Sequence, residues 1–358
     1  MQDYRIALIP GDGIGREVVP AALQVLKRAA EVTDAFTLTT KEFPWGCEFY
    51  LRTGAMMQAG GLRRLAAFDA IFLGAVGYPN VPDHVSLWGL LLPIRQGFEQ
   101  YANVRPIKLL PGIEGPLRGK GPADIDMLFI RENTEGEYCG HGGRLNQGTP
   151  DEVATQTSVF TRKGTERVVR YAFERARERR KRLASATKSN ALNHSMVFWD
   201  EVVEKVAIEY PDVEVTSYLV DALSARMVLK PEVLDVVVAS NLFGDILTDL
   251  GGALQGSLGL PASGNINPEK RYPSMFEPVH GSAPYMAGTN RANPMASIWA
   301  GAMMLEHLGQ AEAARLVMAA LEKVALEGKT LTRDLGGSSG TTEVAAAIAG
   351  SVGGTRKT

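Results

Sequence analysis

The stretch Asn241-Leu242-Phe243-Gly244-Asp245-Ile246-Leu247-Thr248-Asp249 directly follows the apolar run 236–239, and together they decide the class of fold. The apolar run predicts a buried strand, followed by a short loop and a helix. Asp245 and Asp249 are four residues apart, so both carboxylates lie on one helix face. Open α/β sheets bind ligands at the carboxyl ends of their strands. Two oxygen ligands there suit Mg²⁺ or Mn²⁺, although such pairs are more often solvated surface.

Short apolar segments alternate with helical patterns along the rest of the chain. Further strands are predicted at 5–9, 70–73, 127–130, 183–187 and 213–220. Helices are predicted at about 17–30, 197–209 and 294–308. This alternation predicts an α/β fold with a mostly parallel sheet. The glycine-rich segment 136–150 predicts a loop or a hairpin.

A glycine-rich turn, Pro10-Gly11-Asp12-Gly13-Ile14-Gly15, follows the first predicted strand. Its glycines do not have the G-x-G-x-x-G spacing of a Rossmann dinucleotide site. We also expect no second strand that ends in an acidic residue at the distance such a site requires. The turn is therefore interpreted as a tight connection between a strand and a helix.

The composition limits the kinds of partner. The 358 residues suffice for two domains or one large α/β unit, and a net charge of −2 provides no overall field for nucleic acid or anionic membrane. Uncharged apolar runs stay shorter than the roughly 18 residues of a membrane span, and the N-terminus has no signal pattern. Two cysteines, Cys47 and Cys139, without metal-ligand spacing argue against disulfides and structural zinc. We therefore expect a cytoplasmic protein.

One segment, 162–182, departs from the even charge balance. It contains the basic residues Arg175, Arg177, Arg179, Arg180, Lys181 and Arg182. The apolar stripe Val168, Tyr171, Ala172 and Ala176 predicts an amphipathic helix with a solvated basic face. Nucleic-acid binding is the less favoured interpretation, because no stacking aromatic residues are interleaved with the basic ones.

Three arginines, Arg95, Arg105 and Arg131, lie next to apolar or extended segments, where a guanidinium needs an anionic partner. For each one alone, an internal salt bridge is the more common explanation. Together they suggest a pocket for a small dicarboxylate, because the guanidinium fork grips carboxylates bidentately.

Other polar residues are candidates for proton transfer or nucleotide binding. Lys188 and Asp221 each follow a strand, and a lysine in apolar surroundings acts as a base, although a solvated lysine explains Lys188 equally well. The Tyr138 phenol can deliver a proton. His280 lies in a rigid Gly- and Pro-rich loop, which favours either a structural role or a nucleotide contact.

Taken in order, the motifs of this chain resemble those of the β-decarboxylating dehydrogenases. That family includes isopropylmalate, isocitrate, homoisocitrate and tartrate/D-malate dehydrogenases. The resemblance runs essentially end to end and is carried by segments 9–15, 101–106, 131–138, 188–190, 241–249 and 277–294.

The resemblance implies an α/β isocitrate/isopropylmalate dehydrogenase-like fold that is not a Rossmann fold. Residues 1–100 plus 250–358 would form a discontinuous cofactor-binding domain, and 101–249 a smaller domain for dimerisation, substrate and metal. It also implies a homodimer with shared active sites, in which Lys188 and Asp221 reach the neighbouring subunit's site. The region after Tyr138 would join an intersubunit sheet.

The family also implies roles for individual residues. Arg95, Arg105 and Arg131 would hold substrate carboxylates, while Asp245, Asp249 and the neighbour's Asp221 would bind Mg²⁺ or Mn²⁺. Lys188 would accept the hydroxyl proton, and Tyr138 would protonate the product. Residues near the nicotinamide would be Gly74, Ala75, Val76 and Asn190. Residues implied for the rest of the cofactor are Glu277, His280, Gly281, Ser282, Ala283, Pro284, Tyr285 and Asn293.

The segment before Arg95 faces the C3 substituent of the substrate in this family. Isocitrate enzymes have a serine where this chain has Gly89, and isopropylmalate enzymes usually have a glutamate in place of Trp88. The bulky indole should leave room only for a small C3 group. Segment 81–89 resembles the tartrate/D-malate branch, which implies D-malate, tartrate or both as substrate. Leu91 and Leu92 keep 3-isopropylmalate as the alternative.

The cofactor motif departs from the family pattern. NAD-linked members usually have Asp-Ile after Gly-Ser-Ala-Pro, whereas this chain has Tyr285-Met286, with Arg291 nearby. We still expect NAD, and K⁺ is an additional cofactor of many tartrate/D-malate relatives.

Some relatives are non-catalytic regulatory subunits, but all five catalytic and metal positions are retained here. The sequence does not choose among the tartrate stereoisomers or the possible metals, and it does not distinguish a dimer from a tetramer.

Overall fold

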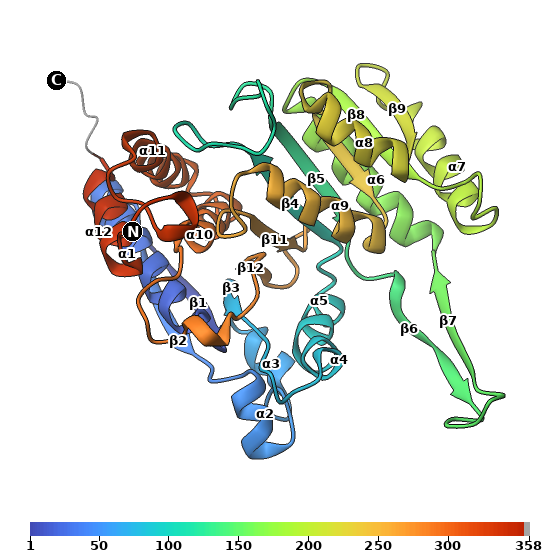
Figure 1. The fold of residues 1–358 in the computed structure, drawn as a ribbon, viewed down its shortest axis with the longest axis horizontal. Coiled ribbons are helices and arrows are strands. Elements are labelled where there is room, and N and C mark those ends of the chain that lie inside the picture. Colours follow the sequence, from blue (N-terminus) through green and yellow to red (C-terminus); the bar gives the residue numbers. More distant parts are fainter. Residues whose placement is uncertain (354–358) are drawn as a thin grey trace. The chain divides into compact units, whose positions relative to one another are not determined.

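The structure is a computed structural model that describes residues 1–353, and the chain divides into two compact units (Figure 1). Unit 1 comprises residues 1–100, 106–125 and 252 onward. Unit 2 comprises residues 101–105 and 126–251. Strand β4 (Ala102–Lys108) has its first four residues in unit 2 and the rest in unit 1.

Unit 1 contains five strands of its own. They are β1 (Gln2–Gly11), β2 (Phe36–Glu42), β3 (Ala70–Ala75), β11 (Ala262–Ile266) and β12 (Ser274–Pro278). Their order is β2-β1-β3-β12-β11, and among them only β11 and β12 pair antiparallel. The predicted strands at 5–9 and 70–73 are confirmed, and the sequence analysis missed the other three. Because β3 is buried along its whole length, helices cover both its faces.

Four longer helices surround these strands. They are α1 (Gly15–Thr33), α10 (Met295–His307), α11 (Ala311–Glu327) and α12 (Thr341–Ser351). Helix α10 is apolar nearly all round and buried over most of its length, which is typical of a central helix. Helix α1 contacts both α10 and α12, so segments from opposite ends of the chain share one core. Shorter helical turns in unit 1 are α2 (Cys47–Thr53), α3 (Gly61–Leu65), η3 (Pro284–Met286) and η4 (Arg333–Leu335).

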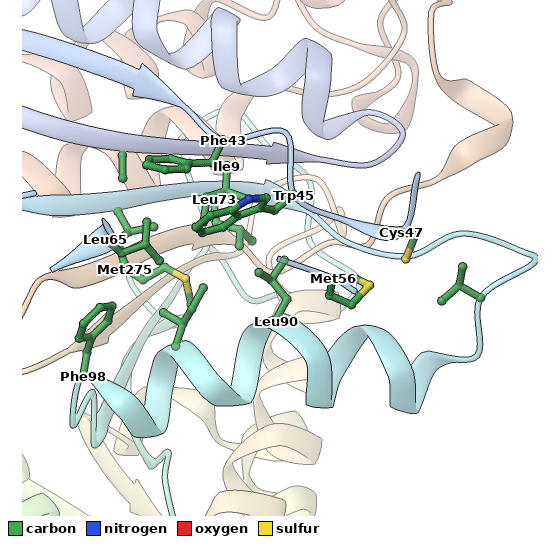
Figure 2. Close-up of a cluster of buried hydrophobic side chains, with 14 residues drawn as sticks. Ile9, Phe43, Trp45, Cys47, Met56, Leu65, Leu73, Leu90, Phe98 and Met275 are labelled. Atoms are coloured by element: carbon green, nitrogen blue, oxygen red, sulfur yellow. The ribbon is translucent and has the colours of Figure 1, made fainter. Parts of the chain in front are cut away.

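The segment that carries Trp88 and Arg95 is a continuous helical run. It consists of α4 (Asp83–Ser86), a π-helical turn η1 (Leu87–Leu91) and α5 (Leu92–Gly97). Leu90 of this run and Phe98, directly after it, belong to one buried apolar cluster with Leu73 and Met275 of the sheet (Figure 2). This packing holds the run in place, and π-helical turns are common at functional sites.

Unit 2 has a fully parallel group of strands. They are β5 (Asp126–Glu132), β8 (Arg182–Thr187), β9 (Glu214–Leu219) and β10 (Val236–Ala239), in the order β5-β10-β8-β9. The helices are α6 (Arg162–Arg177), α7 (Ser195–Ala207), α8 (Val220–Leu229), the short η2 (Pro231–Val233) and α9 (Asn241–Leu254), whose residues from Gly252 onward belong to unit 1. All four strands were predicted, and β10 is buried along its whole length, as its continuous apolar run indicates.

The glycine-rich segment after Tyr138 forms a two-stranded hairpin. Strand β6 (Gly136–Leu145) pairs antiparallel with β7 (Val153–Val159), and no other strand of the described residues joins them (Figure 1). Most of its residues are exposed on both faces. An isolated hairpin is marginally stable in water.

The basic segment is the predicted amphipathic helix, α6, with Val168, Ala172 and Ala176 buried. Its basic face is not simply solvated, however. Arg177 pairs with Asp212 at 2.8 Å, and Arg179 and Arg180 both reach the fully buried Asp235, at 2.7 and 3.4 Å. Much of the positive charge is therefore compensated within unit 2.

The strand β2, which the sequence analysis missed, does end in an acidic residue, Glu42. Glu42 lies further after Gly15 than the about 20 residues that separate the glycines and the acid in a Rossmann site, so the argument from distance is not contradicted. The glycine spacing remains a valid argument, and the turn itself is tight, as predicted: Gly11 and Gly13 both have positive φ, at 72° and 53°. Among residues 1–353, no helix combines the length and the apolarity that crossing a membrane would require.

Candidate active site

The aspartate helix begins immediately after its strand, since only Ser240 separates β10 from α9. Both carboxylates face Arg105, whose guanidinium lies 3.5 Å from Asp245 and 3.9 Å from Asp249. The predicted common face of Asp245 and Asp249 is therefore present. The exposed fraction of the Asp249 side chain is 73%, and that of Asp245 is 35%. Both remain accessible to a ligand.

Arg131 is the most buried charge of this cluster, with a side chain only 2% exposed. Its guanidinium donates to the Asn241 side-chain oxygen from Nε at 3.0 Å and from Nη2 at 2.7 Å, and it pairs with Asp245. Gly244 makes this path possible, because a Cβ there would lie 2.6 Å from Cγ of Arg131. The glycine of the Asn-Leu-Phe-Gly-Asp motif therefore serves close packing of the arginine.

Arg105 and Tyr138 complete the cluster. A second buried guanidinium, that of Arg105, donates to the Thr248 hydroxyl at 2.6 Å. The Tyr138 hydroxyl donates to Asp245 at 2.9 Å, and its ring lies 5.4 Å from the Arg131 guanidinium carbon. The sequence analysis gave no roles to Asn241 and Thr248. Their spacing from Asp245, four before and three after, is the signal that places them on the same helix face.

The oxygen atoms of this cluster suit a divalent cation. They belong to the carboxylates of Asp245 and Asp249, and carboxylate oxygens are the ligands that Mg²⁺ and Mn²⁺ prefer. The guanidinium groups of Arg105 and Arg131 compensate the charge of the two carboxylates. Within residues 1–353 no three Asp, Glu, His or Cys side chains gather closely enough to hold a metal. Asp221, the third predicted ligand, therefore does not join Asp245 and Asp249 within one chain.

Lys188 and Asp221 form a separate pair, 2.9 Å apart. The parallel register that sets Thr187 opposite Leu219 brings the residues after these two strands together. The ammonium of Lys188 lowers the pKa of Asp221. The Asp221 side chain is 66% exposed, so this pair presents its charges to the outside of unit 2. Asn190 follows in the same turn.

Arg95 does have an anionic partner within the protein. Its guanidinium lies 2.9 Å from Glu277, and both side chains are only 8% exposed. Asn265 donates to the same Glu277 oxygen at 2.7 Å. All three predicted substrate arginines thus take part in internal ion pairs, the alternative that the sequence left open for each. Trp88 lies in the same helical run as Arg95 and is 42% exposed.

The loops predicted to bind the cofactor meet at the glycine-rich turn. The Asp12 carboxylate accepts hydrogen bonds from the backbone N–H groups of Cys47 (2.9 Å) and Gly77 (3.1 Å). The N–H of Asp12 donates to Ala75 at 2.7 Å, and that of Ile14 donates to Ser282 at 2.8 Å. Gly74–Val76 and the loop after His280 are therefore joined through one turn, largely by backbone hydrogen bonds.

A cavity of about 650 Å³ lies beside these loops in unit 1. Its walls include five of the predicted cofactor residues: His280, Gly281, Ala283, Tyr285 and Asn293. They also include Arg291, Arg333 and Asp334, none of which the sequence analysis assigned to the cofactor. The volume lies in the range of small-molecule sites, about 300–1,000 Å³.

His280 offers an acceptor to this cavity. Its Nδ1 is 3.0 Å from the Gly281 carbonyl, which only accepts, so the proton is assigned to Nδ1. Nε2 is then an acceptor, and it is buried without a hydrogen-bond partner among the described residues. Burial lowers the pKa of His280, so the ring is neutral near pH 7. An unpaired acceptor of this kind fits a donor group of a bound nucleotide.

The structure does not place every predicted cofactor residue on the cavity wall. The Glu277 carboxylate is used by Arg95 and Asn265, and it does not line this cavity. Asn293 lines it, but its side chain also accepts from the Met295 N–H at the start of α10 and donates to Asp334, both at 2.9 Å. Asn190 belongs to unit 2.

A comparison with protein families matches residues 5–348 to the family described as isocitrate/isopropylmalate dehydrogenase. The chain belongs to this family, which confirms the resemblance carried by its motifs and the fold class inferred from it. It is an oxidoreductase that acts on a CH–OH group.

Relatives are similar over nearly their whole length. A probable tartrate dehydrogenase/decarboxylase from Agrobacterium vitis is 54% identical, with 99% of each chain covered. The D-malate dehydrogenase (decarboxylating) of Escherichia coli is 53% identical, covering 97% of this chain and 98% of that protein. A crystal structure of isocitrate dehydrogenase from Methylococcus capsulatus superimposes with a TM-score of 0.87 at 37% identity, covering 98% of this chain and 99% of that one.

Proposed function

We propose that this protein is a metal-dependent, NAD-linked dehydrogenase of a small C4 2-hydroxy diacid, D-malate, tartrate or both, with or without decarboxylation. The observation that carries the proposal is the cluster of Arg105, Arg131, Asp245 and Asp249 with the Tyr138 hydroxyl. It combines cationic groups for carboxylates, oxygen ligands for a cation and a proton donor. The expected products are pyruvate from D-malate, and oxaloglycolate or glycerate from tartrate.

The roles of the arginines follow from their present partners. Arg105 and Arg131 now compensate Asp245 and Asp249. A bound Mg²⁺ or Mn²⁺ would polarise the substrate's hydroxyl and carbonyl oxygens as a Lewis acid. Arg105 and Arg131 would hold substrate carboxylates beside these two aspartates, and Arg95 would be the third such group. Asn241 and Thr248 accept hydrogen bonds from Arg131 and Arg105 and keep them oriented.

Two residues carry the protons. Lys188 would take the proton of the C2 hydroxyl when C2 is oxidised, and NAD⁺, when bound, would supply the hydride acceptor. When CO₂ is then lost, Tyr138 donates its phenolic proton to the carbon that carried the carboxyl group. The Tyr138 hydroxyl already donates to Asp245, so it lies beside the cation ligands.

The site is completed by a second copy of the chain. Lys188 and Asp221 form an exposed pair of their own, and no third carboxylate joins Asp245 and Asp249 within residues 1–353. Both observations support a homodimer in which each subunit provides Lys188 and Asp221 to the other's site. The isolated hairpin β6–β7 supports the same arrangement, since pairing with a second copy would remove its exposed edges.

The helical run before Arg95 supports a small substrate. Trp88 is partly exposed there, and names of relatives include tartrate and D-malate dehydrogenases. A serine at position 89 would not fit easily, because a Cβ there would lie 2.9 Å from Cβ and 2.5 Å from Cγ of Met56. The alternative substrate is 3-isopropylmalate, which Leu91 and Leu92 favour.

We further propose a cytoplasmic location, in line with the two free cysteines.

The test is initial-rate reduction of NAD⁺ and NADP⁺ by the purified protein with Mn²⁺ and K⁺. D-malate, the three tartrate stereoisomers, 3-isopropylmalate and isocitrate are compared side by side, with Asp245→Asn as the inactive control. We expect D-malate or a tartrate to give the highest kcat/KM. A preference for 3-isopropylmalate would contradict the role of Trp88, and no activity on any acid would contradict the proposed function.

A further inference from the structure

A second cavity of unit 1, of about 500 Å³, lies beside the helical run 83–97. Among the described residues it shares no lining residue with the nucleotide cavity around His280. Its walls include two residues of the run and two methionines of the loop between α2 and α3: Val85, Gly89, Met56 and Met57. Trp88, directly before Gly89, does not line it. The cavity therefore adjoins the run on a face that does not carry the indole.

Met56 packs directly against the backbone of the run. Its side chain is only 3% exposed and belongs to the same buried apolar cluster as Leu90 (Figure 2). A Cβ added at Gly89 would lie 2.5 Å from Cγ and 2.9 Å from Cβ of Met56. Because the backbone fixes the position of a Cβ atom, a rotamer change of Met56 would not remove the second contact. Met56 therefore sets how closely the run approaches the loop that carries it.

The backbone behind Met56 is held by the glycine-rich turn. The Met56 carbonyl oxygen accepts from the Gly46 N–H at 3.2 Å. The next N–H, that of Cys47, donates at 2.9 Å to the carboxylate of Asp12, which is fully buried. Met56 is therefore a firm support, and a change in its side chain should move the run more than the loop.

The contact falls on the irregular part of the run. Gly89 lies in the π-helical turn η1, directly after Trp88. The Trp88 side chain is 42% exposed and does not belong to the buried cluster that holds Leu90. Burial of the ring therefore does not fix the indole, and its direction depends on the backbone of this turn. Turns of this kind are frequent at functional sites.

We propose that Met56 is a positioning residue for substrate specificity: by packing against Gly89 it holds the π-helical turn, and with it Trp88, where the indole limits the size of the C3 substituent. The proposal rests on the proposed function in taking Trp88 as a wall of the C3 pocket. Met56 acts through the turn and does not need to touch the substrate. In Met56→Ala the vacated space would join the neighbouring cavity and leave the turn room to move.

The first test is substrate selectivity by steady-state kinetics. The preferred C4 acid, D-malate or a tartrate, is compared with 3-methylmalate and 3-isopropylmalate. We expect Met56→Ala to lower the ratio of kcat/KM for the C4 acid over that for 3-isopropylmalate about tenfold or more, the range for a methylene group or more in an apolar pocket. A mere loss of folded protein lowers kcat/KM for all the acids alike and leaves the ratio unchanged.

The second test needs no substrate. Of the four tryptophans of the chain, Trp45, Trp199 and Trp299 are 1%, 0% and 6% exposed, so acrylamide quenches mainly the fluorescence of Trp88. We expect Met56→Ala to raise the quenching constant of this accessible component, because a less restrained indole meets the quencher more often. Trp88→Phe should remove the component and so confirms its origin.

Two further variants serve as controls. Met57→Ala shortens the neighbouring methionine on the wall of the same cavity, but Met57 packs towards α3: a Cβ added at Gly61 would lie 2.8 Å from its Sδ. We expect the selectivity and the quenching of Met57→Ala to equal those of the wild type. Met56→Leu conserves the apolar volume and should also keep both. If Met56→Ala does not fold, Met56→Val, which removes less volume, replaces it.

The outcomes separate this inference from the proposed function. An unchanged selectivity ratio or an unchanged quenching constant in the folded Met56→Ala variant would overturn the role of Met56. Equal changes in Met57→Ala would also overturn it, because general loosening around the cavity would then be the cause. If the wild type oxidises none of the acids or prefers 3-isopropylmalate, the proposed function is wrong and the pocket role of Met56 falls with it. The quenching result still decides whether Met56 positions Trp88.

Discussion

The arginine–aspartate cluster of unit 2 and the nucleotide cavity of unit 1 hold their charges in opposite ways. In the cluster, Arg105 and Arg131 are at most 8% exposed and are already paired with Asp245 or Asp249. In the cavity, Arg291 and Arg333 are exposed and have no partner among the described residues. The arginines of the cluster are therefore paired within the protein, whereas those of the cavity wall are not.

This difference follows from burial. A buried guanidinium without a partner costs several kcal/mol, so the charges of the cluster must be compensated within the protein. An exposed guanidinium is hydrated and needs no partner. The loops beside the cavity are joined in part by backbone hydrogen bonds, such as that from the Ile14 N–H to the Ser282 carbonyl oxygen. Changes in the cluster should therefore affect catalysis and stability, whereas changes on the cavity wall should alter only which nucleotide binds.

The largest expected effect is that of Asp245→Asn. The change removes a cation ligand and the charge that compensates Arg131, while the side chain keeps its size. We expect kcat to fall about a thousandfold, since a catalytic cation contributes several kcal/mol to the transition state. Steady-state kinetics over a Mn²⁺ titration measure this loss. Asp212→Asn, at a surface ion pair, is the control and should have no effect on kcat. Full activity of Asp245→Asn in the presence of a chelator would remove the metal site.

The second prediction tests whether Lys188 of another subunit completes the site at the arginine–aspartate cluster. Lys188→Ala and Tyr138→Phe should each lose about a hundredfold or more of the activity, as loss of a general acid or base implies. In a mixture of the two after subunit exchange, half of the dimers are hybrids with one intact site. We expect recovery of about one quarter of wild-type activity for such a twofold-symmetric dimer. No recovery, although hybrids are detected by mass spectrometry, would mean that sites are not shared.

Glu277→Gln tests the buried pair in unit 1. Arg95 would remain buried with its charge uncompensated, although Asn265 can still donate to the new amide oxygen. We expect a loss of about 3 kcal/mol in the free energy of unfolding, the range for breaking a buried pair. Urea denaturation followed by circular dichroism measures it. Breaking the exposed pair in Asp212→Asn should lower the free energy of unfolding much less. Equal losses in the two variants would show that burial is not the deciding factor.

The smallest expected effect is a pH dependence of the free energy of unfolding that is caused by His307 in unit 1. Burial, reinforced by Lys270, lowers the pKa of His307 to about 4. Because the unfolded value is about 6.5, the unfolded chain takes up the proton first, so stability is complete above that pH and falls as the pH drops towards 4. We expect His307 to account for a loss of about 1–2 kcal/mol between pH 7 and pH 5. His307→Gln should reduce this slope in denaturant titrations, and an unchanged slope would contradict the shift.

The sequence predicted the parallel strands of unit 2 well, and the clearest signal was the continuous apolar run 236–239 of β10. It missed β2, whose exposed residues interrupt the apolar pattern, and β11 and β12, which contain polar residues that tertiary packing buries. The four-residue spacing of Asp245 and Asp249 sufficed to place both on one face. The partners of Arg105 and Arg131 were not predicted, because Thr248 and Asn241 act through contacts across 143 and 110 residues.

By itself, the sequence determined the α/β class, the aspartate helix and the family, because local periodicity and short motifs carry that information. Only the tertiary structure decided which charges compensate one another: Arg95 with Glu277, Arg131 with Asp245, and Lys188 with Asp221. It also brought Arg291 and Arg333 to one cavity with Tyr285. The physical reason is that burial and pairing depend on distances between segments far apart in the chain, and no local pattern encodes those distances.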